Sequence, residues 1–238
     1  MEDKIEAFKQ MVEKSNKIVF FGGAGVSTES GIPDFRSKDG LYNQKYKYPP
    51  EMILSHTFFI RYTEEFYKFY KEKMNSLKYE PNITHFKLAE LEAEGKLDAV
   101  ITQNIDGLHQ KAGSKKVYEL HGSVLRNYCM KCGKFYDAEY VFGSDGVPTC
   151  ECGGIVKPDV VLYEEGLDND TISGAIAKIA NADLLIVGGT SLTVQPASSL
   201  INYFRGDNLV LINKDATMYD SKADLVINES LGKVFEKI

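Results

Sequence analysis

Four cysteines lie close together in the chain and have the spacing of a metal site. They are Cys129, Cys132, Cys150 and Cys152, in the pattern C-x2-C-x17-C-x-C. Zinc binds four thiolates in a tetrahedron, and two closely spaced pairs joined by a hairpin can supply them. No fifth ligand or neighbouring acid is available to hold a water molecule, so the pattern favours a closed structural site over a catalytic one. A redox dithiol is the alternative interpretation of these two pairs.

Three other segments with glycines or polar side chains each follow an apolar run typical of a buried strand. They are Gly22 to Gly25, Gln103 to Asp106 and Gly188 to Ser191, and His121 follows a further apolar run. Ligands of open parallel sheets bind beyond the carboxyl ends of the strands. We therefore expect these segments to meet at one binding site.

The first of these segments is also compatible with a dinucleotide-binding turn. Glycines in Gly23-Ala24-Gly25 would let the backbone approach a pyrophosphate. The fingerprint is imperfect, because Thr28 occupies the third glycine position and no acid follows about 20 residues on to hold a ribose. By itself, the turn is equally compatible with a structural role.

Hydrophobic periodicity predicts the elements that position these residues. Ile5, Phe8 and Val12 recur at helical spacing and predict an N-terminal helix. Strands are predicted at 17–21, 99–102, 117–120, 159–163, 183–187, 208–212 and 224–227. Helices are predicted at 56–78, 82–95 and 170–180, after residue 196, and from about residue 231. Strands alternating with helices, the strands being almost continuously apolar, indicate an α/β fold whose parallel sheet is covered on both faces.

Composition and charge exclude several classes of protein. The 238 residues are 43% hydrophobic and 26% charged, which excludes a largely disordered or fibrous chain. No apolar run approaches the ~18 residues of a membrane span, and the polar N-terminus does not resemble a signal peptide, so we expect a cytoplasmic protein. The net charge of −6, without a basic stripe, argues against a nucleic-acid partner and suits a basic protein or peptide.

Taken together, the motifs resemble those of the sirtuin family, the NAD-dependent protein lysine deacylases. The matching stretches occur in order and extend over nearly the whole chain, from residue 20 to about 231. They are Gly23-Ala24-Gly25-Val26-Ser27 with Gly31-Ile32-Pro33-Asp34-Phe35-Arg36, Gln103-Asn104-Ile105-Asp106, His121-Gly122, Gly189-Thr190-Ser191-Leu192 with Pro196-Ala197, and Asn213 with Thr217. The compact length and Glu65-Phe66-Tyr67 most resemble the bacterial deacetylase type.

The resemblance implies a fold, a division into domains and an activity. It implies a Rossmann-like parallel sheet with helices on both faces, plus a small module with a zinc ribbon and helices. Residues 1–40, 82–124 and 157–238 would form the NAD-binding domain, and the helical insert 41–81 with the zinc ribbon 125–156 the small one. The implied activity transfers the acyl group of acyl-lysine to ADP-ribose and releases nicotinamide, with NAD as co-substrate and one structural zinc.

The resemblance also implies roles for individual residues. His121 would be the general base on a ribose hydroxyl, since an imidazole titrates near neutrality; a buried structural histidine is the alternative. Asn104 would orient the ribose and an ordered water, and Asp106 and Ile105 would hold the nicotinamide carboxamide. The remaining contacts to NAD would come from Ala24, Thr28, Phe35, Arg36, Gln103, Thr190, Ser191, Asn213 and Leu231.

The stretch 156–163 resembles the strand beside which the substrate peptide is added. Val161 and Leu162 are the expected substrate contacts, and the peptide would lie between this strand and the loop 189–194, so that acyl-lysine proteins are the expected partners. Glu164 replaces a family glycine. Tyr70 stands where family members that remove dicarboxylic acyl groups have an arginine, so acetyl and other uncharged groups are expected. Lys68 and Lys71 are nearby but lack the bidentate fork of arginine, and a cation such as Lys71 in the tunnel would alter this preference.

Other functions remain open from the sequence. An NAD-dependent dehydrogenase would need a complete glycine fingerprint, and a non-catalytic zinc-ribbon interaction module would have no need for Asn104, Asp106 and His121 together. Mono-ADP-ribosyl transfer is a close variant of the deacylase, because water or a protein side chain could intercept the same ribose carbon.

Overall fold

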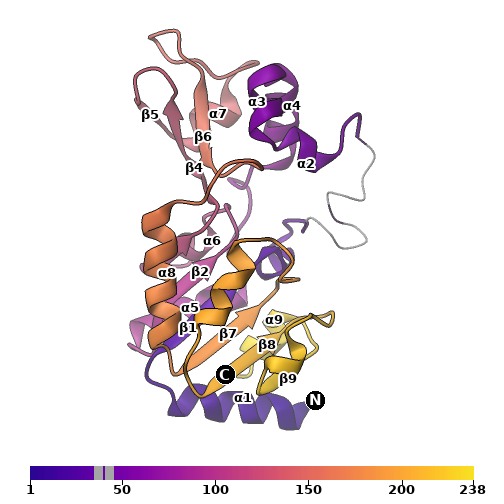
Figure 1. Cartoon of the computed structure of the whole chain (residues 1–238), viewed down its shortest axis with the longest axis vertical. Coiled ribbons are helices and arrows are strands. Elements are labelled where there is room, and N and C mark those ends of the chain that lie inside the picture. Colours follow the sequence, from indigo (N-terminus) through magenta and orange to yellow (C-terminus); the bar gives the residue numbers. More distant parts are fainter. Residues whose placement is uncertain (35–39, 41–45) are drawn as a thin grey trace.

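The computed structural model describes residues 1–34, 40 and 46–238. These residues form a large part built on a parallel sheet and a small part at one end of it (Figure 1). The small part contains two separate stretches of chain, one before and one after the second and third strands of the large sheet.

A six-stranded parallel sheet forms the centre of the large part within the described residues. In spatial order its strands are β3 (Val117–Glu119), β2 (Leu97–Thr102), β1 (Ile18–Gly22), β7 (Leu184–Gly188), β8 (Asn208–Ile212) and β9 (Leu225–Ile227). The chain proceeds outward from β1 in one direction and then from β7 in the other. This is the doubly wound order of dinucleotide-binding folds, and the order of the strands reverses between β1 and β7.

Successive side chains of each central strand point to opposite faces of the sheet. In β1, Ile18 and Phe20 belong to one core cluster, while Val19 and Phe21 belong to the other. Both clusters are buried because helices cover both faces. The sequence of these strands is accordingly almost continuously apolar rather than alternating with polar residues.

Helices from distant parts of the chain cover the two faces. The first face is covered by α1 (Glu2–Lys14), α5 (Ile83–Ala93) and α9 (Leu231–Phe235), where Phe235 packs edge-on against both Phe8 and Phe20. The second is covered by α8 (Asn169–Asn181) and the 3-10 helix η4 (Ala197–Tyr203). Short turns complete this part: η1 (Ala24–Val26), η2 (Thr28–Ser30), α6 (Leu108–Lys111) and η5 (Asp220–Lys222).

The small part combines helices with a three-stranded antiparallel sheet. Its helices are α2 (Pro50–Ile53), α3 (His56–Arg61), α4 (Thr63–Lys73) and α7 (Ala138–Gly143). Its strands, in spatial order, are β5 (Phe135–Tyr136), β4 (Gly122–Cys129) and β6 (Val156–Val160). Aromatic side chains of α3 and α4 and apolar residues of β4 and β6 form its core.

The structure confirms the α/β fold class and corrects one strand of the prediction. The strand expected at 159–163 ends at Val160 and pairs antiparallel with β4 in the small sheet, instead of belonging to the parallel sheet. An apolar run indicates a strand but does not specify its partner, because pairing is decided by tertiary contacts. The exact domain boundaries remain a prediction. Among the described residues, no helix has the length and apolar character needed to cross a bilayer.

Candidate functional site

One cavity of about 760 Å³ lies where the large part meets the small part. The turn after β1, the segment after β2 and the loop after β7 line it together with the segment that follows β6. Thirteen of the expected site residues line this cavity: Ala24, Thr28, Gln103, Asn104, Ile105, Asp106, His121, Val161, Leu162, Thr190, Ser191, Asn213 and Leu231. The other two expected cofactor contacts, Phe35 and Arg36, lie outside the described residues.

The glycines at the switch point bring two loops into direct contact. Gly25 donates its backbone N–H to the Gly189 carbonyl at 2.8 Å. A Cβ on Gly25 would lie 2.7 Å from Gly189 Cα, and Gly189 itself has a φ of 61°, which favours glycine. These glycines therefore fix the two loops against each other, a packing role that the dinucleotide fingerprint alone did not indicate.

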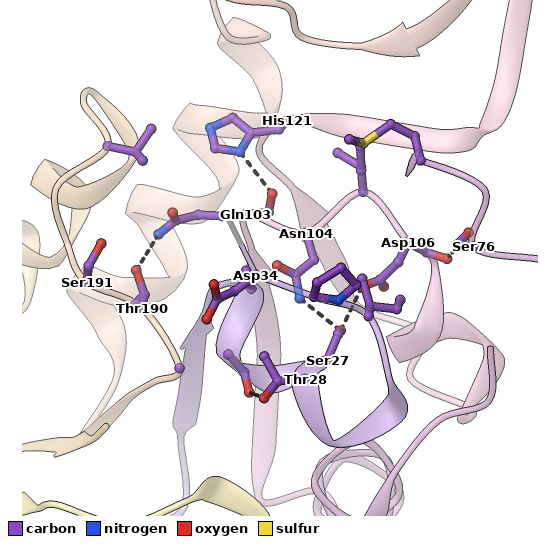
Figure 2. Close-up of a pocket in the computed structure, with 18 of the residues that line it drawn as sticks. Ser27, Thr28, Asp34, Ser76, Gln103, Asn104, Asp106, His121, Thr190 and Ser191 are labelled. Carbon is purple, nitrogen blue, oxygen red and sulfur yellow. Dashed lines mark hydrogen bonds between the residues drawn. The ribbon is translucent and has the colours of Figure 1, made fainter. Parts of the chain in front are cut away.

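Ser27 links the two polar side chains of the segment after β2 (Figure 2). Its hydroxyl donates to Asp106 Oδ2 at 2.7 Å and accepts from Asn104 Nδ2 at 3.1 Å. The other carboxylate oxygen of Asp106 accepts from the backbone N–H of Leu108 at 2.9 Å. The three side chains are thus held in one arrangement at the floor of the cavity.

Ser27 itself was missed as a functional residue in the sequence. It is 1% exposed, and it belongs to the glycine-rich signature, for which the resemblance implied no role at this position. A small hydroxyl residue beside a glycine turn is a common turn residue, so its type gave no signal. Only the fold brings β1 next to β2 and places the serine against Asp106.

Burial affects the charge of Asp106. Removal of the carboxylate from water raises the pKa of Asp106, and the hydrogen bonds from Leu108 and Ser27 oppose this shift only in part. A buried acid with raised pKa costs stability when ionised, and such groups are concentrated at functional sites.

His121 lies in the turn between β3 and β4, with its ring directed into the cavity (Figure 2). Its Nδ1 lies 2.9 Å from the Gln103 carbonyl oxygen, which can only accept, so Nδ1 carries the proton. Burial lowers the pKa of His121, although the Gln103 hydrogen bond opposes this. The ring is therefore neutral near pH 7, and its unprotonated Nε2 is directed away from Gln103.

The residue after this histidine, Gly122, must be a glycine because β4 and β6 approach each other closely at this point. It has a φ of 74°, and a Cβ there would collide with the carbonyl oxygen of Asp159 in β6. The next residue pair is joined by a hydrogen bond from the Val161 N–H to the His121 carbonyl at 3.0 Å. The small sheet thereby fixes the position of His121 relative to Val161.

The amide of Gln103 reaches across to the opposite loop. Its Nε2 donates to Thr190 Oγ1 at 3.3 Å, while the Ser191 hydroxyl lies 2.9 Å from that of Thr193. Asn213, beyond β8, donates to the Asp215 carbonyl at 2.8 Å. Polar groups from the segments that follow β1, β2, β7 and β8 therefore surround one side of the cavity.

The segment after β6 is attached to helix α3 on the other side. Glu165 Oε1 lies 2.9 Å from His56 Nδ1, and its second oxygen accepts from Lys157 at 3.2 Å and from the Leu162 N–H at 2.9 Å. Glu164 adopts a φ of 76° and accepts from the Thr57 N–H at 2.8 Å. The glutamate at this glycine position is thus accommodated, and its carboxylate caps α3.

The four cysteines form a compact cluster away from the cavity. Their sulfurs all lie within 4.8 Å of one another, with Cys129–Cys152 at 3.5 Å and Cys132–Cys150 at 3.6 Å. A tetrahedral zinc with Zn–S bonds of about 2.3 Å needs sulfurs about 3.8 Å apart. Four converging thiols fit zinc and are more than a redox dithiol would need.

Fold and cavity together define a nucleotide-binding α/β protein with a four-cysteine module. Comparison with known proteins is more specific: the model of the Sir2 family matches residues 23–196. A protein of Clostridium perfringens named NAD-dependent protein deacetylase is 63% identical, covering 100% of this chain and 99% of its own. One of Clostridium acetobutylicum with the same name is 62% identical over 99% and 98%. The chain belongs to the Sir2 family.

Solved structures agree with this assignment. A Sir2 variant with a deacetylated p53 peptide and 3′-O-acetyl ADP ribose superposes with a TM-score of 0.91 at 40% identity, covering 98% of this chain and 96% of that one. A Sir2 complex with a p53 peptide and NAD+ gives a TM-score of 0.87 at 41% identity, with the same coverage. The sirtuin resemblance of the sequence is thereby confirmed.

Proposed function

We propose that this chain is an NAD-dependent protein lysine deacetylase, which transfers the acetyl group of acetyl-lysine to ADP-ribose and releases nicotinamide. The observation that carries the proposal is the neutral His121, whose unprotonated Nε2 lies in the same cavity as the Asn104–Ser27–Asp106 chain. The shared name of the relatives in both Clostridium species supports the same activity.

The residues of the cavity fit NAD as co-substrate. Its volume lies in the range of small-molecule sites, about 300–1,000 Å³. NAD supplies the ribose carbon to which the acyl oxygen bonds as nicotinamide leaves. The amides of Gln103 and Asn104 can donate to ribose hydroxyls and accept from them, and Asp106 with Ile105 can hold the carboxamide.

His121 acts as general base in this proposal. Its Nε2 accepts the proton of a ribose hydroxyl, while Nδ1 keeps its hydrogen bond to the Gln103 carbonyl. That carbonyl dipole stabilises the imidazolium as the proton arrives and prevents the ring from turning. Because burial lowers the pKa of His121, the base remains unprotonated at neutral pH.

The substrate peptide binds as an added strand. β6 lies at the edge of the small sheet and leads directly to Val161 and Leu162 at the cavity. An extended peptide between this segment and the loop 189–194 would direct its acyl-lysine past Leu162, which is 2% exposed. The four cysteines hold one structural zinc, which keeps the small sheet in place.

Uncharged acyl groups are the proposed substrates. The ammonium of Lys71 donates to the Ser144 carbonyl, the Ser144 hydroxyl and the Gly146 carbonyl, and Lys71 does not line the cavity. Lys73 does line the cavity, but its ammonium is paired with Glu72 at 2.9 Å, and a carboxylate buried without a cation of its own is costly. One peptide carrying either acetyl-lysine or succinyl-lysine tests this: we expect faster turnover of the acetyl form, and a preference for succinyl would contradict it.

The decisive test of the activity follows products by mass. Incubation with NAD and an acetyl-lysine peptide is expected to release nicotinamide, deacetylated peptide and acetyl-ADP-ribose in equal amounts. Formation of NADH would indicate a dehydrogenase. Nicotinamide release with a mass gain on protein would indicate ADP-ribosyl transfer, and absence of all products would contradict the proposal.

A further inference from the structure

His121 lies where the chain passes from one sheet to the other. Strand β3 of the parallel sheet ends at Glu119, and strand β4 of the small sheet begins at Gly122, so that residues 120–121 form the junction. On the side of the parallel sheet, the Leu120 N–H donates to the Thr102 carbonyl in β2 at 2.9 Å. The position of the His121 ring in the cavity therefore depends on how the two sheets are fixed relative to each other.

Arg126 of β4 forms ion pairs on both sides of this junction. Its Nη1 donates to Glu119 Oε2 in β3 at 2.6 Å, and its Nε donates to Asp159 Oδ2 in β6 at 2.9 Å. Among the ion pairs of the residues that the structure describes, the pair of Glu119 with Arg126 is the one that joins a strand of the parallel sheet to a strand of the small sheet. The guanidinium thus connects β3, β4 and β6.

The carboxylate of Glu119 is the more buried of the two partners. The Glu119 side chain is 9% exposed, against 44% for Asp159. A carboxylate as buried as that of Glu119 is costly when it lacks a cation, whereas an ion pair between exposed groups contributes little. The planar guanidinium of Arg126 can donate to both carboxylates at once in a fixed geometry, which the single ammonium of a lysine does not do. The contact with Glu119 therefore holds β4 against the last residue of β3, and the contact with Asp159 orients the guanidinium.

Asp159 lies beside the other end of the junction. Its carbonyl oxygen is the atom with which a Cβ on Gly122 would collide, at the point where β4 and β6 pair. Shortly after it in the chain comes Val161, whose N–H donates to the His121 carbonyl at 3.0 Å. The guanidinium thus holds a residue two positions before His121 and, in β6, the strand that leads to the partner of the His121 backbone.

Arg126 acts on the site from outside it, since neither this arginine nor Glu119 or Asp159 lines the cavity. We propose that Arg126 is a positioning residue for the general base. By bridging Glu119 and Asp159, it holds the junction 120–121 in the arrangement that directs Nε2 of His121 at the ribose hydroxyl. This inference rests on the proposed deacetylase function and adds to it a residue that touches neither substrate nor NAD.

Two steps of the same reaction separate a positioning role from a merely structural one. Nicotinamide leaves before the base acts, so exchange of labelled nicotinamide into NAD reports the earlier step and deacetylation reports both. Arg126→Gln should lower kcat for an acetyl-lysine peptide by about 5- to 100-fold, because displacing a catalytic group by about 1 Å can cost ~10²-fold in rate. The exchange rate and the KM for NAD should remain those of the wild-type protein.

Arg126→Lys is the second variant, because it keeps a positive charge beside Glu119 but removes the fork that reaches two carboxylates. It should lower kcat less than Arg126→Gln does, again with unchanged exchange. Lys178→Gln is the matched control. Lys178 pairs with Asp98 at 2.9 Å near the start of β2, whereas the cavity lies beyond the ends of the strands. This control removes one positive charge and one ion pair from the same sheet, and it should leave kcat unchanged.

Thermal unfolding shows whether each variant is folded, and Arg126→Lys carries the test if Arg126→Gln does not fold. Unchanged deacetylation by the folded variants would overturn the inference. A parallel fall in nicotinamide exchange would also overturn it, because the substitution would then disturb the whole cavity rather than the base. In both cases deacetylation by the wild-type protein would uphold the proposed function, whereas its absence in the wild-type protein would overturn both.

Discussion

The parallel sheet and the small module of this protein are held together in different ways. In the large part, side chains of each strand alternate between two apolar clusters, each covered by helices. In the small part, one core combines the aromatic rings of α3 and α4 with the buried Cys129 and Cys150. The first arrangement depends chiefly on apolar burial, whereas the second also contains four converging cysteines that can hold a zinc ion.

Both parts contribute residues to the cavity, although they are stabilised in different ways. The small module contributes Val161 and Leu162 and fixes His121 through strand pairing, while the large part supplies Asn104 and Asp106. The cavity is complete only when both parts are folded. Loss of the metal should therefore abolish activity without unfolding the sheet.

Removal of zinc should have the largest effect. Structural zinc sites contribute about 10–16 kcal/mol of apparent binding free energy in small peptides, so Cys150→Ala or a chelator should unfold the small module. Hydrogen exchange is expected to lose protection in β4 and β6 and to retain it in β1 and β7. A metal-free protein that is folded throughout and fully active would contradict this prediction.

Substitution of His121 should affect rate and leave both parts folded. Loss of a general base typically costs ~10²–10⁴ in rate, so His121→Ala should lose deacetylation by that factor. Binding of NAD should persist, as should some exchange of labelled nicotinamide, because nicotinamide leaves before the base acts. Wild-type turnover in His121→Ala would exclude its catalytic role.

Acid should destabilise the large part through two buried histidines. The rings of His85 on α5 and His109 on α6 lie 4.8 Å apart; burial lowers the pKa of His85 to about 4 and that of His109 well below its usual value. The unfolded state, with pKa values near 6.5, binds more protons than the native state at pH 4–6.5, so stability falls as pH falls.

The free energy of unfolding should decrease by about 2–3 kcal/mol between pH 6.5 and 4 because of His85 alone, and His109 should add to this decrease. Urea titrations across that range measure the decrease. His109→Gln should make the pH dependence shallower. A dependence as steep as that of the wild-type protein would show that other groups cause the acid sensitivity.

Substitution of Asp106 should change stability least. Unlike loss of zinc or acid pH, it should not lower the free energy of unfolding. Because burial raises the pKa of Asp106, its ionised form is unfavourable at pH 7, and Asp106→Asn should leave stability unchanged or raise it by about 1 kcal/mol. Turnover and inhibition by nicotinamide should both weaken. Thermal unfolding and steady-state kinetics measure the two effects, and a large loss of stability would mean that Asp106 is chiefly structural.

Much of the large part could be predicted from the sequence. The apolar runs of β1, β2, β7 and β8 have the composition of strands buried on both faces, and the cysteine spacing predicted the cluster that the structure contains. Strand β6 was misplaced and β4 was not predicted as a strand, because neither segment is a continuous apolar run and the local pattern does not indicate which strand a segment will join.

The sequence by itself determined the residue types of the site and their positions after strands. It also indicated that they meet at one site, because parallel strands place their carboxyl ends at one edge of a sheet. Tertiary structure decided which of those residues touch. It joined Ser27 to Asp106, made Nδ1 of His121 the protonated nitrogen, and left the Tyr70 hydroxyl without a partner while Tyr67 found one. Such contacts link residues 18 to 89 positions apart, where no local periodicity specifies the distance or the direction of a side chain.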